Sequence, residues 1–330
     1  MALRNLITDV PGVRVGHAGD ERLGSGVTVV LFEEPAVASI DLRGGGPGTR
    51  ETALLDPAQT VGGIDAITLS GGSAFGLDAA SGTQAWLREQ GRGFAVRSAR
   101  VPIVPGAILF DLLNGGDKDW GRYPPYRELG YAATAGAGAD FALGSVGAGL
   151  GATTVNLKGG AGSASAMIDG ITVGAMAAVN AAGSVVIGDG PCFWAAPFEQ
   201  NAEFGGRGLP SPIPPEALAP RTKGSPQMST TLVVLATDAA LTKAQAKRLA
   251  VMAQTGIARA VYPVHTPLDG DVLFAASTGR RPLADPLFVL ARLGAIAANV
   301  TARAIARAVH EATALPVPGA LPSWRDKFGR

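Results

Sequence analysis

The sequence predicts an α/β fold in which helices cover a sheet from outside. Strand-length apolar runs alternate with one helical segment in the first part of the chain, and the C-terminal part reads strand, helix, strand and long helix. Layers of helix packed on sheet follow from such an order. A hydrophobic content of 47% over 330 residues supplies a sizeable core. We therefore expect a single domain, residues 1–330, built as an α/β sandwich rather than a barrel.

The first part of the chain carries short apolar runs bounded by turn residues. A turn at 33–35 is expected to join the first two strands, and the glycine-rich loop 70–76 leads from the third strand into a helix over 77–90. A loop that opens a helix is a common site architecture, because helix N-termini offer free N–H groups. The expected strands cover 26–32, 37–42, 65–69, 155–157, 172–179 and 184–187.

The C-terminal part has clearer signals. Residues 231–236 form an almost unbroken apolar run, typical of a strand covered on both faces. Thr242 and Gln245 make a capping box at the start of a helix with apolar residues at helical spacing. A strand over 272–276 and a long helix over 285–312 complete the order.

Composition excludes several classes of protein. The net charge is +1, from 28 basic and 27 acidic residues without a block of one sign, which argues against nucleic acid or an anionic membrane as partner. Residues 1–9 lack the apolar core of a signal peptide, and no membrane span is expected, so we expect a cytoplasmic protein. The single cysteine, Cys192, excludes an intrachain disulfide. With three scattered histidines, neither a metal site nor a cofactor is expected.

Glycine is abundant, with 46 residues, and much of it is clustered. Such clusters mark tight turns and places where the backbone approaches another backbone or a ligand. One interpretation is that these loops gather around a site. The other is a compact sheet protein encoded by a GC-rich genome. The clusters are Gly44–Gly46, Gly71–Gly72, Gly147–Gly151 and Gly159–Gly162.

A proline-rich connection ends abruptly at a pair of threonines. Residues 205–229 contain six prolines and read as a surface connection, after which Thr230 opens the apolar run. If the chain is cut before Thr230, the new α-amine can act as base for the hydroxyl of the same residue. The alternatives are that threonine simply begins a strand, where it is favoured, and that Ser229 supplies the hydroxyl.

Three further positions are candidates, and each has a structural alternative. Asp269 and Asp271 flank one glycine, so they either form an ordinary turn or orient an ammonium or hydroxyl group. Lys158 lies beside a glycine cluster and is either a surface strand end or a buried cation that needs partners. Asn180 stands among small apolar residues and is either a structural turn or an oxyanion donor.

Two other site types are weaker candidates. Ser73 follows two glycines, as a hydrolase nucleophile would, but the second glycine of a nucleophile elbow is missing. No pattern places His17, His265 or His310 near Ser73. The run 147–151 lacks the third glycine and the downstream acid of a dinucleotide fingerprint.

Taken in order, these motifs resemble one family along nearly the whole chain. It is the self-cleaving L-aminopeptidase/D-amidase-esterase family, which includes β-peptidyl aminopeptidases and endo-type nylon-oligomer hydrolases. The series in this order is specific, although no single piece would be. The resembling segments are 7–17, 44–52, 69–77, 158–160, 179–181, 230–238 and 263–271.

The resemblance implies a four-layer α/β/β/α sandwich and a precursor that cuts itself into two chains, here 1–229 and 230–330. It implies Thr230 as nucleophile, Lys158 as the active-site lysine and Asn180 near the oxyanion. Asp269 and Asp271 match the acidic pair of the nylon-hydrolase branch. The family also suggests a homo-oligomer, a tetramer of processed heterodimers. Gly71, Gly72, Ser73 and Phe110 fall on its substrate or oxyanion side.

Two departures stand out. Ser229 precedes the nucleophile where the family usually has Asn or Gly, and Phe110 stands where the family has a tyrosine. Either Tyr123, Tyr126 or Tyr131 replaces that hydroxyl, or the contact is absent.

The resulting hypothesis is an amide hydrolase with a Thr230 acyl-enzyme that acts on linear amides such as 6-aminohexanoate oligomers. The alternative substrates are short peptides, β-peptides and D-amino-acid amides or esters. An acyl-enzyme can also be captured by an amine acceptor instead of water. A protein of another class, an unprocessed and non-catalytic binding protein, is the remaining alternative.

Overall fold

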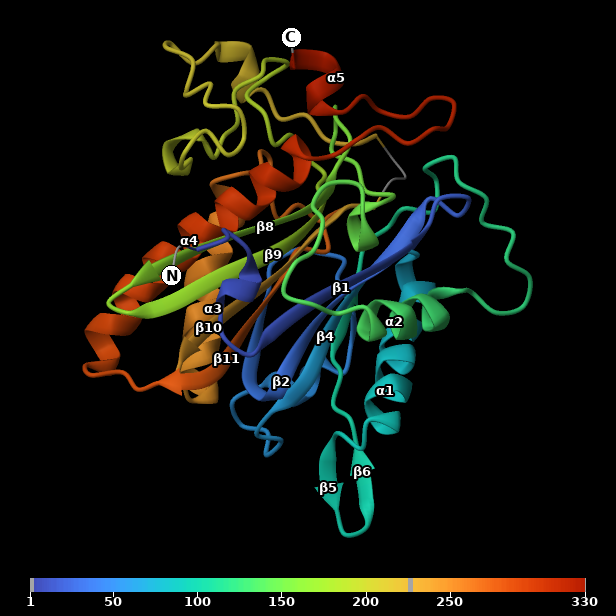
Figure 1. Ribbon diagram of the computed structural model, residues 1–330. Coiled ribbons are helices and arrows are strands. Elements are labelled where there is room, and N and C mark those ends of the chain that lie inside the picture. The colour runs from blue at the N-terminus through green and yellow to red at the C-terminus, as the bar shows by residue number, and fades with distance from the viewer. Residues whose placement is uncertain (1–2, 225–227, 330) are drawn as a thin grey trace.

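A computed structural model describes residues 3–224 and 228–329, and Figure 1 shows its layers. Residues 1–2 of the expected N-terminal segment and 225–227 of the proline-rich connection lie outside the described residues. The strands are β1 (Val13–Asp20), β2 (Ser25–Leu42), β3 (Gly48–Arg50), β4 (Ile64–Ser70), β5 (Phe94–Val96), β6 (Ala99–Val101), β7 (Gly106–Ile108), β8 (Gly160–Ile168), β9 (Ile171–Asn180), β10 (Thr230–Ala239) and β11 (Val272–Arg281). The α-helices are α1 (Ala79–Glu89), α2 (Tyr126–Ala135), α3 (Lys243–Ala258), α4 (Pro286–His310) and α5 (Trp324–Phe328).

One long strand, β2, belongs to two sheets. Its first half pairs antiparallel with β1 and β4, and its second half pairs antiparallel with β11. The strand order is β3-β7-β4-β2-β11-β10-β9-β8, with β1 beside β2. The short β5–β6 hairpin stands apart and projects from the body of the molecule. β2 therefore fixes how the two sheets are joined.

The expected turn at 33–35 is wrong, because the chain continues through it as strand β2. Pro35 cannot donate a ladder hydrogen bond, and the register with β4 shifts between Leu31 and Ala36. The irregularity falls where β2 passes from one sheet to the other, so the proline is accommodated without ending the strand. Glu33 forms ion pairs there with Arg14 at 2.9 Å and Arg280 at 3.2 Å.

Three apolar cores separate four layers. On β10, Leu232 and Val234 belong to the core between the two sheets, whereas Val233 and Leu235 belong to the core under α3 and α4. The third core lies between the other sheet and α1 and α2. Because side chains alternate across a strand, a strand covered on both faces must be apolar throughout. The molecule is therefore the four-layer α/β/β/α sandwich that the family resemblance implies (Figure 1).

The two helices behind β10 begin at defined caps. Thr242 accepts the N–H of Gln245 at 3.2 Å, and the expected capping box is present. Asp285 caps α4, with Pro286 as the first helical residue. By length and mean hydropathy α4 could cross a membrane, but its apolar side chains pack into the core against α3, β8 and β9.

Several other boundaries differ from the sequence analysis. Residues 155–157 form a bend between the bridged residues Thr153 and Lys158, and residues 184–187 contribute only isolated bridges at Ser184 and Val186. The helix expected from 77 begins at Ala79, after a 3-10 helix over Ser73–Asp78. The glycine-rich run after Lys158 is strand β8. Gly160 and Gly162 are glycine because α4 packs directly on them: a Cβ atom would lie 2.2 Å from the carbonyl oxygens of Ala308 and Ala304, respectively.

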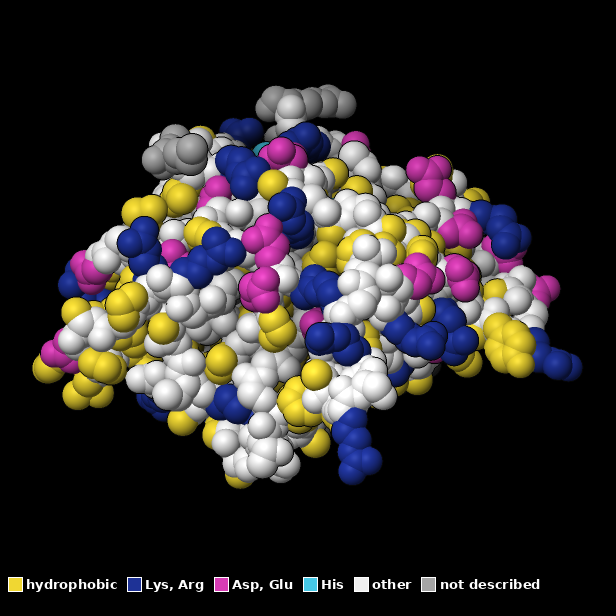
Figure 2. Space-filling model, turned by 60° about the horizontal axis from the view of Figure 1, so that its bottom comes forward, with side chains coloured by type: hydrophobic (Ala, Val, Ile, Leu, Met, Phe, Trp, Pro, Cys, Tyr) yellow, Lys and Arg dark blue, Asp and Glu magenta, His cyan; other side chains and the backbone are white. Residues whose placement is uncertain are grey.

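Figure 2 shows one face of the molecule, on which basic and acidic side chains are interspersed. This mixture agrees with the near-neutral net charge of +1. We see no surface of a single sign on that face.

Replacing Gly162 with Ala is expected to destabilise the protein by about 1–3 kcal/mol, because the added methyl group forces α4 away from β8. Thermal unfolding of purified protein measures the effect. Gly62→Ala is the matched control, since a Cβ atom there meets nothing within 4 Å. Equal melting temperatures for the two variants would contradict the close contact between α4 and β8.

Candidate active site

Thr230 stands at the point where β10 enters the sheet. It is the first residue of β10, pairs with Asn180 of β9 and is 3% exposed. Its hydroxyl donates to the carbonyl oxygen of Ser229 at 2.5 Å. The backbone N–H of Gly270 donates to the same oxygen at 2.7 Å. Two donors therefore converge on the carbonyl of the peptide bond that precedes Thr230.

The two acidic residues before β11 organise this entry point. Asp271 accepts the N–H of Thr231 at 2.7 Å and pairs with the Nδ1 atom of His265 at 2.8 Å. Asp269 accepts the N–H groups of Ala182 at 3.2 Å and Thr266 at 2.8 Å. Burial, together with the charge of Asp271, raises the pKa of Asp269. Asp271 thus holds the backbone directly after Thr230, and Asp269 holds the backbone of two neighbouring segments.

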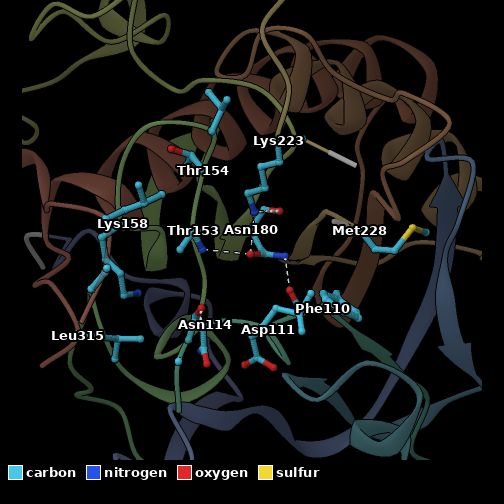
Figure 3. A pocket seen from close by; sticks show the side chains of 18 of the residues that line it. Phe110, Asp111, Asn114, Thr153, Thr154, Lys158, Asn180, Lys223, Met228 and Leu315 are labelled. Atoms are coloured by element: carbon cyan, nitrogen blue, oxygen red, sulfur yellow. Dashed lines mark hydrogen bonds between the residues drawn. The ribbon is translucent and has the colours of Figure 1, made fainter. Parts of the chain in front are cut away.

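Asn180 has a fixed amide orientation. Its side-chain oxygen accepts the N–H of Thr153 at 3.0 Å, and its Nδ2 atom donates to the carbonyl oxygen of Phe110 at 2.9 Å (Figure 3). An amide nitrogen carries two hydrogens. One of them is used on Phe110, which leaves the other for a further acceptor.

Lys158 is a buried cation in a cage of carbonyl groups. Its Nζ atom donates to Gly149 at 2.9 Å, Ala152 at 2.9 Å and Gly159 at 2.8 Å. Burial lowers the pKa of Lys158 to about 7, and the carboxylate of Asp111 opposes that shift. Three acceptors match the three N–H groups of an ammonium, so the cage favours the charged form.

A second buried lysine, Lys223, comes from the proline-rich connection. Its Nζ atom donates to the side-chain oxygen of Asn180 at 3.0 Å and to the backbone oxygen of Asn180 at 3.2 Å. Its backbone N–H donates to Ala182 at 3.1 Å, which anchors the connection beside β9. Sequence reasoning missed Lys223, because a lysine in an irregular, polar segment gives no periodic signal.

Three of these residues, Lys158, Asn180 and Lys223, border one cavity of about 460 Å³, whereas Thr230, Asp269 and Asp271 lie outside its wall. Its wall includes the side chains of Lys158, Asn180 and Lys223 (Figure 3). Apolar side chains cover other parts of the wall, which is the usual make-up of a small-molecule site. They are Phe110, Leu113, Val155, Met228, Leu315 and Leu321.

A buried polar chain lies behind Phe110. Asp111 borders the cavity and accepts the hydroxyl of Ser25 and the N–H of Gly72, both at 2.7 Å. The hydroxyl of Tyr126 donates to Ser25 at 3.2 Å. Of the three tyrosines considered as replacements at Phe110, Tyr126 is therefore the one connected to the cavity, through Ser25 and Asp111. Burial raises the pKa of Asp111.

The glycine clusters do gather around this site. Gly149 and Gly159 supply carbonyl groups to Lys158, and Gly46 donates its N–H to the backbone of Asp269 at 2.8 Å. Gly71 packs on Asp111, where a Cβ atom would lie 2.2 Å from the carboxylate.

Ser73 is not part of a serine–histidine pair. Its N–H donates to Leu109 at 2.9 Å, and Gly71, Gly72 and Ser73 all lie outside the wall of the cavity. The three histidines contact Thr28, Asp271 and Glu311. The Ser73 hydrolase interpretation therefore has no geometric support.

The fold and the comparisons with known proteins agree on the class. The solved structure of the L-aminopeptidase D-Ala-esterase/amidase from Ochrobactrum anthropi, described as a variant of the Ntn hydrolase fold, superimposes with a TM-score of 0.70 at 21% identity. The superposition covers 99% of this chain and 94% of the Ochrobactrum anthropi chain. This likeness establishes the fold as that of Ntn-type hydrolases.

The family model of peptidase family S58 matches residues 5–320, and the chain belongs to that family. It is accordingly a hydrolase of amide bonds. The chain is similar to an uncharacterized aminopeptidase of Mycobacterium tuberculosis, with 44% identity and 98% coverage of both chains. It is also similar to a 6-aminohexanoate-oligomer endohydrolase of a Kocuria species, with 28% identity over 89% of this chain and 80% of the relative.

Replacing Lys158 with Met is expected to lower the free energy of unfolding by about 3 kcal/mol or more, because three buried carbonyl groups lose their donor. Denaturant unfolding measures this loss. Lys247→Met is the control: its side chain is 40% exposed, so the loss there is expected to stay under about 1 kcal/mol. A Lys158→Met protein as stable as the control variant would refute the carbonyl cage.

Proposed function

We propose that this chain is an N-terminal-nucleophile amide hydrolase that cuts its own bond between Ser229 and Thr230 and then uses Thr230 as nucleophile. One observation carries the proposal: the Thr230 hydroxyl and the Gly270 N–H both contact the Ser229 carbonyl oxygen, at 2.5 and 2.7 Å. A nucleophile beside its target, with a donor already on the oxygen that becomes negative, is the arrangement that acyl transfer requires.

Processing follows in two steps. The Thr230 oxygen attacks the Ser229 carbonyl carbon, and the Gly270 N–H stabilises the negative oxygen that forms. The C–N bond then breaks, the hydroxyl proton passes to the departing nitrogen, and an ester links Ser229 to the Thr230 oxygen. Water hydrolyses this ester and releases a Ser229 carboxylate and a Thr230 α-amine.

In the processed protein, the Thr230 amine acts as base for its own hydroxyl. The pKa of a free α-amine is about 8. A positive charge on Lys158 would favour the neutral amine, which is the form that accepts a proton. The hydroxyl oxygen attacks the substrate carbonyl, and the remaining N–H of Asn180 stabilises the oxyanion. The amine part of the substrate leaves with a proton, and water then hydrolyses the acyl-enzyme.

Asp269 and Asp271 act by positioning. Asp271 holds the N–H of Thr231, and Asp269 holds Ala182, so both keep the strand entry in register with β9 and β11. Phe110 presents its backbone carbonyl to Asn180, and this contact orients the amide without a side-chain hydroxyl.

Linear amides such as 6-aminohexanoate oligomers are the proposed substrates. A threonine at the cleavage position, the pair Asp269 and Asp271, and the similarity to the Kocuria endohydrolase support this choice. The name of the more similar Mycobacterium relative favours the second candidate, an aminopeptidase acting on short peptides. Turnover of nylon-6 oligomers and of aminoacyl p-nitroanilides by one preparation decides between the two.

Thr230→Ala is expected to stay a single chain of 33.3 kDa and to be inactive, because both the attacking oxygen and the site of the new amine are lost. Intact mass and N-terminal sequencing measure processing. The control, Thr230→Ser, keeps a hydroxyl and should still be cut. A processed and active Thr230→Ala protein would end the proposal, and an uncut, inert wild type would favour a binding protein.

Gly270→Ala is expected to slow self-cleavage at least tenfold, because a Cβ atom there would lie 2.7 Å from the Thr230 hydroxyl oxygen and displace it. The appearance of the small chain over time, followed by mass spectrometry, gives the rate. The control is Gly62→Ala, which should be processed like the wild type because a Cβ atom there has no neighbour within 4 Å. Normal processing of Gly270→Ala would mean that the Thr230 hydroxyl does not act from this position.

A further inference from the structure

Lys223 is a basic residue of the cavity wall that has no role in the proposed mechanism. It borders the cavity, is 8% exposed and donates twice to Asn180. An ammonium has three N–H groups. The third has no acceptor among residues 3–224 and 228–329, whereas all three donors of Lys158 are used on carbonyl groups.

Basic side chains outnumber acidic ones among the described residues in the wall of the cavity. Lys158 and Lys223 both border it, and Asp111 is the one acidic residue among the described residues of the wall. Asp111 already accepts Ser25 and the N–H of Gly72. Burial holds its pKa above the usual range, which favours its neutral form. Buried charges require a partner, so this wall calls for an anion.

We propose that Lys223 binds the carboxylate of the substrate and that the enzyme therefore favours amides with a free carboxyl group near the bond that is cut. This inference rests on the proposed function and adds the substrate class. The side chain of Asn180 contacts Lys223 and its backbone pairs with Thr230, so one residue links the proposed carboxylate contact to the nucleophile. The apolar wall accommodates the aliphatic part of such a substrate.

A carboxylate can also come from the protein itself. Self-cleavage would leave a new carboxylate on Ser229, which lies beside Asp269 and six residues after Lys223 along the chain. If that group occupied Lys223, added carboxylates would neither bind there nor be preferred. A preference for substrates with a carboxylate therefore indicates that the substrate, and not Ser229, supplies the carboxylate bound to Lys223.

The test compares matched substrates on the processed protein. One pair is alanyl-alanine and its C-terminal amide, and the other is the 6-aminohexanoate dimer and its C-terminal amide. Chromatography measures cleavage of the internal amide bond that the two members of a pair share. The wild type is expected to show a kcat/KM at least about tenfold higher for the acid of an accepted pair. In Lys223→Met, this ratio of acid to amide should fall to near one.

Arg221→Met is the matched control. Arg221 lies two residues away on the same connection and carries the same charge, but it pairs with Asp189 at 2.8 Å outside the cavity. If the preference came from general positive charge, both variants would lose it. Loss in Lys223→Met alone supports direct contact, and retention in Lys223→Met overturns the inference.

A measurement on the wild type covers the case in which Lys223→Met is not processed. Burial lowers the pKa of Lys223 to about 7, and the charged groups that face it are Asp269, which opposes the shift, and Lys158, which adds to it. The charged form exists below that pKa, so the ratio of acid to amide turnover should fall as the pH rises from 6 to 9. A ratio independent of pH overturns the inference.

The failures of the two proposals are distinguishable. A wild type that is processed and hydrolyses the neutral amides without preferring the acids refutes the role of Lys223 and leaves the amide hydrolase intact. A wild type that is uncut and hydrolyses none of the four compounds refutes the proposed function and this inference with it.

Discussion

The structure depends on the position of β10 between β9 and β11. β10 pairs antiparallel with β9 and parallel with β11, and both of its faces are buried. The ladder with β9 includes its first residue, Thr230, and the ladder with β11 begins at Leu232. An isolated parallel bridge in the same register joins Ser229 to Asp269. The peptide bond before Thr230 cannot move without breaking these ladders.

Burial of charged groups at this site opposes folding. Two lysines are buried around one cavity, and each must be compensated by hydrogen bonds because burial disfavours its charge. For Lys158 the compensation comes from three backbone carbonyl groups, which approach closely because the surrounding chain is rich in glycine. Lys223 has a less complete set of partners. Perturbed groups of this kind are characteristic of functional sites.

The parts of the fold with periodic or capping signals could be predicted. β10, α3 with its Thr242 cap, and α4 follow from apolar runs and helix-start residues, and Thr230, Lys158, Asn180 and the Asp269–Asp271 pair were candidates from their contexts. Their roles remain predictions. Elements decided by tertiary packing could not be predicted. β8 resembles a glycine loop because α4 requires small residues there, and β2 continues through Pro35 because two sheets meet at that point.

Lys223 and the Gly270 N–H were missed for a related reason. A backbone donor leaves no trace in the sequence, and a lysine in a proline-rich connection looks like a solvated surface residue. Only the pairing of that connection with Ala182 brings Lys223 inside. Polar side chains that stand among apolar neighbours in the sequence can be recognised as site candidates. Groups such as Lys223 and the Gly270 N–H enter the site only through pairing between distant segments, so the sequence alone does not reveal them.

The central place of β10 would decide how the protein behaves if the proposed cut occurs. The chain from Thr230 onward would supply β10, β11, α3 and α4, which lie in the middle and on one outer face of the sandwich. Neither piece could bury its apolar surface alone, so the pieces would stay joined as an interlocked pair. Once unfolded, they would have to find each other by diffusion, and recovery would depend on protein concentration. Cleavage would thereby turn the folding of a single chain into a reaction between two chains.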